Sequence, residues 1–159
     1  MRRTIILFAC LLMAGAAFAA GSGGGGGGGG GMGGKPTTPI TANDWYNTGY
    51  SASNAGKYQE AVNDFKTAIS LRPDYAEAYN MLGFCTRKLG NVDEAFTYYE
   101  KALKLKPNFP EAREYYGEAY LQQGNLAKAV QQYIILEKAN NRNARELLDK
   151  IDDFVNQKS

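Results

Sequence analysis

Residues 76–109 read AEAYNMLGFCTRKLGNVDEAFTYYEKALKLKPNF, and they carry the clearest structural pattern of the chain. Its glycines, Gly83 and Gly90, lie among helix-forming residues, where a glycine costs about 1 kcal/mol relative to alanine. Both recur at steps of 34 residues, in the sets Gly49/Gly83/Gly117 and Gly56/Gly90/Gly124. Glycines that recur in register across three segments indicate one structural unit that is used three times.

Other positions repeat with the same spacing. They are a small residue at Ala61, Ala95 and Ala129, an aromatic residue at Phe65, Tyr99 and Tyr133, and a proline at Pro73 and Pro107. Residues 42–75, 76–109 and 110–143 therefore resemble the tetratricopeptide repeat (TPR), whose pattern is W-x2-L-G-x2-Y, A-x3-F and P over 34 residues. The resemblance implies an all-α fold of three tandem helix-turn-helix TPR repeats that form a right-handed superhelix.

Local signals predict where the helices begin, end and approach one another. A left-handed residue is expected after each first helix, at Gly56, Gly90 and Gly124. Pro73 and Pro107 should end the second helices. Side-chain caps are expected at Thr41, Asp74 and Asn108, each followed three residues later by an acidic residue. The other set of glycines, Gly49, Gly83 and Gly117, should allow close approach of the paired helix.

An amphipathic helix follows the third repeat. Between residues 143 and 157 the apolar residues Ala144, Leu147, Leu148, Ile151, Phe154 and Val155 recur at helical spacing. Charged residues occupy the other face of this helix. We expect it to be a capping helix that covers the open apolar edge of the last repeat.

Residues 1–19 have the pattern of a secretory signal peptide. Arg2 and Arg3 precede an apolar run that ends in Ala17-Phe18-Ala19, so we expect cleavage after Ala19. The apolar run before Cys10 is too short for lipoprotein processing there. The pattern predicts an exported protein of the periplasm or cell envelope, without stable membrane insertion after cleavage.

Residues 20–40 are rich in glycine, with an unbroken run at positions 23–31. Such a segment cannot bury a core, so we expect a disordered linker or tail. It would act as a tether if its far end were anchored, and it would be a passive tail if the leader were removed.

The composition argues against catalysis and against nucleic-acid binding. The chain has 18 basic and 16 acidic residues and no histidine, and the basic count falls to 16 without Arg2 and Arg3. A neutral protein has no bulk attraction for nucleic acid. Cys85 is the only cysteine after the leader, which excludes a thiolate zinc site, and we expect it to be a packed, inert thiol. We predict no catalytic residue, no metal and no cofactor.

A candidate peptide groove follows from the resemblance, because the first helix of each TPR repeat lines the concave face. The positions expected to be exposed there are Asn43, Tyr46, Asn47, Tyr50, Glu77, Asn80, Met81, Phe84, Arg87, Glu111, Glu114, Tyr115, Glu118 and Gln122. Tyrosine is enriched at binding hot spots, although several of these aromatic residues are equally suited to packing between helices. The acidic residues at 111, 114 and 118 share one helix face, which suggests a preference for basic peptides.

These features predict a non-catalytic scaffold or adaptor that binds a protein or peptide of unknown identity in the concave groove. The alternative is a structural subunit that self-associates, or docks onto a larger envelope complex, through its convex face. The sequence does not identify the partner.

Overall fold

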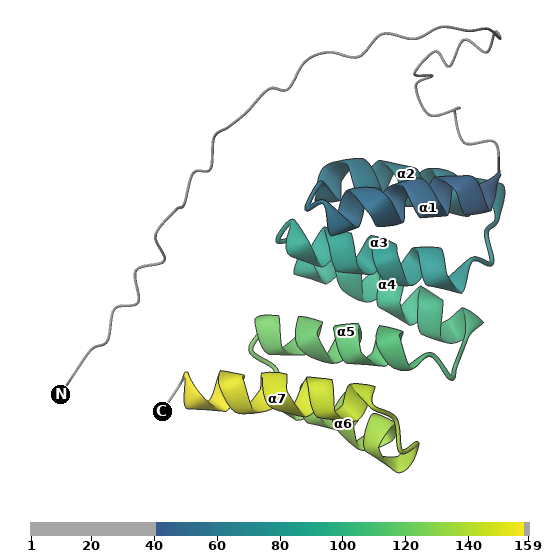
Figure 1. Ribbon diagram of the computed structural model, residues 1–159. Helices are drawn as coiled ribbons and strands as arrows, with labels where there is room; N and C mark the ends of the chain where they lie inside the picture. Colours follow the sequence, from purple (N-terminus) through teal and green to yellow (C-terminus); the bar gives the residue numbers. More distant parts are fainter. Residues whose placement is uncertain (1–40, 158–159) are drawn as a thin grey trace, which may run out of the picture. The chain divides into compact units, whose positions relative to one another are not determined.

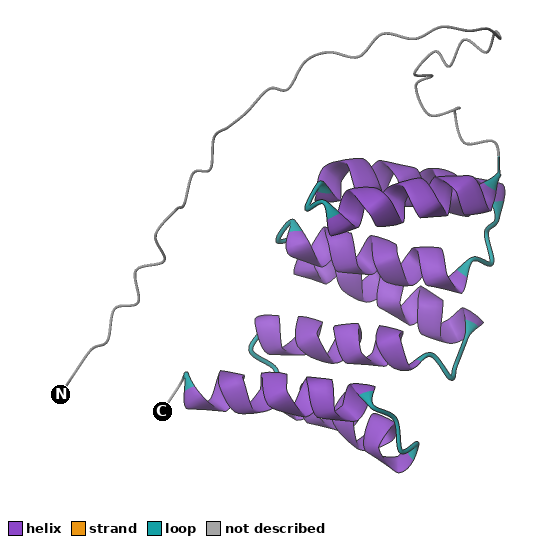
Figure 2. Cartoon of the chain, in the orientation of Figure 1, coloured by secondary structure: helices purple, strands orange, loops and turns teal. Residues whose placement is uncertain are grey.

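The computed structural model describes residues 41–157 (Figure 1). The predicted signal peptide and glycine-rich segment lie outside this range and stay predictions. The described residues form seven helices and no strand (Figure 2). The helices are α1 (Ala42–Asn54), α2 (Tyr58–Leu71), α3 (Ala76–Lys88), α4 (Val92–Leu105), α5 (Pro110–Gln122), α6 (Leu126–Lys138) and α7 (Asn143–Asn156). They form three helical hairpins and a final helix, which confirms the all-α repeat fold.

The helix ends follow most of the local signals. At the start of α1, Thr41 and Asp44 form a reciprocal capping box, in which the Asp44 N–H donates to Thr41 Oγ1 at 3.1 Å. The glycines after α1, α3 and α5 have φ values of 74°, 91° and 83°, in the left-handed region that a residue with a Cβ rarely adopts. After α6 the non-glycine Asn140 has a φ of 47°, which asparagine tolerates better than most residues.

The caps expected at Asp74 and Asn108 are wrong. Helices α3 and α5 begin at Ala76 and Pro110, so the residues at the cap position are Tyr75 and Phe109, and neither makes a side-chain cap hydrogen bond. The polar residues therefore lie one position too early to bond the free N–H groups. Phe109 instead packs in a buried cluster with neighbouring alanines, so apolar packing fixes this helix start.

Close helix approach is confirmed at the second set of glycines. A Cβ at Gly49 would lie 3.0 Å from the Phe65 ring, and one at Gly83 would lie 2.8 Å from Cε1 of Tyr99. At Gly117 the nearest atom is Cδ2 of Leu147, at 2.6 Å, which belongs to α7 rather than to α6. At this third glycine the close contact is therefore made by the final helix and not by the paired helix.

The third repeat differs in the side chain that packs against its glycine, and the position of Tyr133 explains this difference. Phe65 and Tyr99 are fully buried, whereas the equivalent Tyr133 is only partly buried and donates its hydroxyl to Glu137 on its own helix, at 2.9 Å. Leu147 and Ile151 of α7 fill the core instead. The cap is thus part of the hydrophobic core.

Candidate functional site

The first helices of the hairpins share one face of the array with α7, while α2, α4 and α6 lie behind them (Figure 1). A hollow of about 350 Å³ opens on this face across α1, α3 and α5. We call it the first hollow. Its lining residues are Tyr46, Tyr50, Glu77, Asn80, Met81, Lys106, Phe109, Glu111 and Tyr115. All except Lys106 and Phe109 were predicted from the sequence.

Lys106 and Phe109 were missed because they belong to the connection between α4 and α5. Prediction from the first helices alone overlooks this loop, which reaches the face where α5 begins. The Lys106 ammonium pairs with the Glu77 carboxylate at 2.8 Å and lies 4.5 Å from the centre of the Phe109 ring. Including the residues that directly follow each second helix would have added Lys106 and Phe109 to the predicted site.

Tyr46 and Tyr50 divide between packing and exposure. The Tyr46 ring lies 5.0 Å from the Tyr75 ring and 5.6 Å from the Phe65 ring, and burial raises the pKa of Tyr46 to about 12. Tyr50 stacks on Tyr46 at 6.2 Å but remains 46% exposed. Tyr46 therefore packs between helices, while Tyr50 presents an aromatic surface to solvent.

Phe84 and Tyr115 pack against each other across α3 and α5, with ring centres 5.1 Å apart. Phe84 also contacts Tyr58 of α2 edge-on at 6.2 Å. Both rings are half-buried. Tyr115 borders the first hollow, but Phe84 does not line it, so packing between helices is the main role of Phe84.

Asn80 is a buried polar residue that lines the first hollow. It is only 3% exposed, and its side-chain oxygen Oδ1 has no hydrogen-bond partner among the described residues. An unsatisfied buried acceptor costs about 1–3 kcal/mol.

Four residues predicted to be exposed are buried: Asn80, Met81, Arg87 and Glu114. Arg87 is covered by neighbouring helices and donates to Tyr99 OH at 3.4 Å and to Glu118 Oε2 at 2.8 Å. Glu114 accepts a short hydrogen bond from the Asn143 amide at the start of α7. Helical periodicity identifies one face of a helix but does not show what the next helix covers.

The predicted acidic face is therefore broken up. Glu118 is paired with Arg87, and Glu114 lies under α7, where burial raises its pKa to about 7. Glu111 alone remains an exposed carboxylate at the rim of the first hollow. The face presents one unpaired acidic group, and not a patch that selects strongly basic peptides.

The remaining predicted residues lie around the rim of this face. Asn43 is already engaged, because its Oδ1 accepts from Arg72 Nη2 at 3.0 Å and from Tyr75 OH at 3.1 Å. Asn47 is exposed on α1, outside the first hollow. Gln122 is exposed near the end of α5 and lines a different hollow, together with Glu118.

That second hollow lies between α5 and α7 and has a volume of about 320 Å³. Its lining residues are Glu118, Leu121, Gln122, Lys150, Asp153, Phe154 and Gln157. The residues from α7 were not predicted as site residues, because the sequence indicated only a capping role for this helix.

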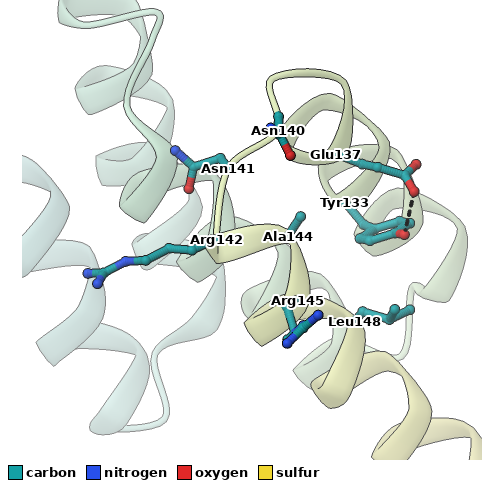
Figure 3. A pocket seen from close by; sticks show the side chains of 8 residues that line it. All are labelled: Tyr133, Glu137, Asn140, Asn141, Arg142, Ala144, Arg145 and Leu148. Atoms are coloured by element: carbon teal, nitrogen blue, oxygen red, sulfur yellow. Dashed lines mark hydrogen bonds between the residues drawn. The ribbon is translucent and has the colours of Figure 1, made fainter.

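A third hollow, of about 530 Å³, lies where α6 turns into α7 (Figure 3). The Tyr133–Glu137 hydrogen bond forms one side, and Arg142 and Arg145 project from the turn and the start of α7 (Figure 3). None of the predicted site residues lines this hollow, and it is separate from the first two.

The described residues offer no catalytic arrangement that we recognise. Residues 41–157 hold no cluster of three or more Cys, Asp or Glu side chains suited to a metal ion. The Cys85 thiol is buried, lies 3.4 Å from Ser53 Oγ, and has its pKa raised by burial, which is typical of an inert thiol. None of the helices in this range is both long and apolar enough to span a bilayer.

The architecture is that of a helical repeat array whose first helices carry a hollowed face, a class built for binding. Two family profiles described as tetratricopeptide repeat match residues 46–110 and 86–151, and together they extend over more than half of the chain. The chain belongs to the tetratricopeptide repeat family. The search of curated proteins found no match.

Solved structures share this fold. A structure of MamA is 29% identical, with a TM-score of 0.56 over 71% of this chain; this chain spans only 61% of MamA. The Yersinia enterocolitica type III secretion chaperone SycD, in complex with a peptide of the translocator YopD, is 22% identical (TM-score 0.63, 72% of this chain, 89% of that chain). The first TPR of Spaghetti (RPAP3), bound to the HSP90 peptide SRMEEVD, is 22% identical (TM-score 0.64, 72% and 93%).

Proposed function

We propose that this chain is a non-catalytic adaptor that holds an extended segment of a partner protein against α1, α3 and α5. The observation that carries the proposal is the first hollow itself, which is lined by Asn80 and by the Tyr50 ring, the latter 46% exposed. An extended segment supplies backbone N–H donors, and its side chains project alternately, so one can enter the hollow.

The charges of the first hollow argue against a C-terminal carboxylate as the ligand. Among the described residues, Lys106 is the one cation that lines this hollow, and it already pairs with Glu77. Arg87, the other cation predicted for this face, pairs with Glu118. Since neither cation is free, an internal segment of a protein fits this surface better than a chain end.

Two of the solved structures that share this fold are complexes with a peptide. Their identity to this chain is too low to transfer a ligand, but they support the class of partner. From the lining of the first hollow we infer that this partner is an extended segment with an apolar side chain.

The test is binding of twelve-residue peptides selected against the purified chain from a random display library. We expect Asn80→Ala and Tyr50→Ala each to weaken binding of the selected peptides about tenfold, or 1.4 kcal/mol. Asn80→Ala should keep or raise the melting temperature, because it removes an unpaired buried acceptor. Fluorescence anisotropy and thermal melting measure the two effects.

Ile134→Ala is the matched control, because Ile134 lies on α6, is 40% exposed and does not line the first hollow. It should not change peptide binding. If no peptide is selected, or if Asn80→Ala binds as well as the wild type, the proposal is wrong. A molecular mass that rises with concentration in light scattering, without peptide binding, would instead favour the assembly role.

We propose further that the protein works in the periplasm or cell envelope. The support is the signal-peptide pattern of residues 1–19. Mass spectrometry of the mature N-terminus should find Ala20 as the first residue. An intact Met1 in protein from the envelope fraction would show that the leader is retained, and residues 20–40 would then be a tether.

A further inference from the structure

The second hollow arises from the way in which α7 packs on α5. The two helices touch where Leu147 meets Gly117 and where Asn143 bonds the buried Glu114. The second hollow lies further along, among residues 118–122 of α5 and 150–157 of α7. Both hollows are lined in part by residues of α5.

The second hollow combines apolar side chains with a rim of balanced charge. Leu121 and Phe154 supply apolar surface, and both also pack on the core. Lys150 and Asp153 are exposed charges of opposite sign on α7, and the charge of Glu118 is balanced by Arg87. This surface suits an uncharged apolar side chain.

We propose that α7 supplies a second binding subsite, so that the ligand is an extended segment with two apolar side chains about five residues apart and a basic residue beside the first. This inference rests on the proposed function. It assigns to α7 a role in recognition beyond its role in the core.

The spacing follows from helix geometry. Neighbouring helix axes lie about 8–10 Å apart. The first hollow is lined from α1, α3 and α5 and the second from α5 and α7, so we expect their centres to lie between one and two such steps apart. The hollows are also offset along α5, from Tyr115 to Leu121, which is about 9 Å at 1.5 Å per residue. The resulting path of roughly 15–18 Å corresponds to about five residues at 3.3 Å each.

The charge preference follows from the groups that line the two hollows. In the first hollow Glu77 and Lys106 neutralise each other, which leaves the exposed Glu111 as its unbalanced charge. In the second hollow the opposite charges of Lys150 and Asp153 leave no net preference. A lysine or arginine beside the first apolar side chain would therefore be attracted to Glu111.

The probes are fluorescein-labelled Gly-Ser peptides with a Leu-Lys pair and a second Leu placed two, five or eight residues from the first, in both chain directions. We expect the five-residue spacing to bind best, about tenfold tighter than a peptide with a single Leu. Gln122→Trp, which fills the second hollow, should reduce the affinity to that of the single-Leu peptide. Gln131→Trp is the matched control, because Gln131 is an exposed residue of α6. It should not change the affinity for any of these peptides.

The outcomes separate this inference from the proposed function. If peptides bind but their affinity does not depend on the second Leu or on Gln122→Trp, the α7 subsite is wrong and the first hollow stands. If Tyr50→Ala and Asn80→Ala also leave all binding unchanged, the proposed function fails with it. Equal binding of Leu-Lys and Leu-Glu peptides would overturn the role of Glu111.

Discussion

Gly83→Ala is expected to destabilise the array by about 1–2 kcal/mol and to lower the melting temperature by roughly 5–10 °C. The new Cβ would lie 2.8 Å from Cε1 of Tyr99, whose ring is fully buried and whose hydroxyl is held by Arg87. Overpacking costs about 1–3 kcal/mol. This exceeds the gain in helix propensity of up to about 1 kcal/mol, so the steric effect dominates.

A Tyr99→Leu background isolates the steric cause. The shorter side chain removes the ring atoms that the new Cβ would meet, so Gly83→Ala should then be neutral or stabilising. A double-mutant cycle by urea denaturation measures this coupling. Equal destabilisation by Gly83→Ala in both backgrounds would show that contact with the Tyr99 ring is not the reason for glycine here.

The second large effect concerns Glu114 and pH. Burial, with smaller contributions from Glu146 on α7 and Glu118 on α5, raises the pKa of Glu114 from 4.5 to about 7, although the Asn143 hydrogen bond opposes the shift. The folded protein therefore holds a proton that the unfolded chain releases near pH 4.5. The associated stability is full below pH 4.5 and is lost as the pH rises through 7.

Glu114→Gln should remove this dependence, since the amide can still accept from Asn143 and never becomes charged. At pH 8 the variant should be more stable by about 2 kcal/mol, whereas at pH 4 the two proteins should differ little. Thermal melts from pH 4 to 8 test this. Glu111→Gln, on the exposed face of the same helix, is the control and should leave the pH profile unchanged. A wild-type protein that becomes more stable between pH 5 and 7 would contradict the sign.

The expected loss of stability at higher pH should also affect the second hollow, which lies between α5 and α7. Glu114 and Asn143 join these two helices by a hydrogen bond. If α7 loosens first, as a terminal element often does, the two-anchor peptides should lose their advantage above pH 7. Binding through the first hollow should persist.

Most of the fold could be predicted because it depends on local rules. A left-handed turn requires glycine, a proline ends a helix, and a glycine at the contact admits an aromatic ring from the neighbour. These rules act within one repeat, so the residues that obey them recur every 34 positions and can be recognised in the sequence. The caps at Asp74 and Asn108 failed because packing of Tyr75 and Phe109, and not a polar side chain, decides where these helices begin.

The site was predicted less completely. The sequence identified the helix face of the first hollow, but it placed Arg87 and Glu114 there as exposed residues and missed Lys106 and Phe109. The state of each side chain depends on contacts across repeats, such as Arg87 with Glu118 and Glu114 with Asn143. No periodic pattern within one helix encodes those contacts.

The repeat, its register and the helix face that carries the first hollow could be read from the sequence, because they follow from side chains that act on neighbouring backbone. Which residues of that face stay exposed depends on tertiary contacts. These contacts place α7 against Gly117, bury Glu114, pair Glu118 with Arg87, and leave Oδ1 of Asn80 without a partner among the described residues. These outcomes depend on how closely successive helices approach, which is set by the packing of side chains far apart in the sequence.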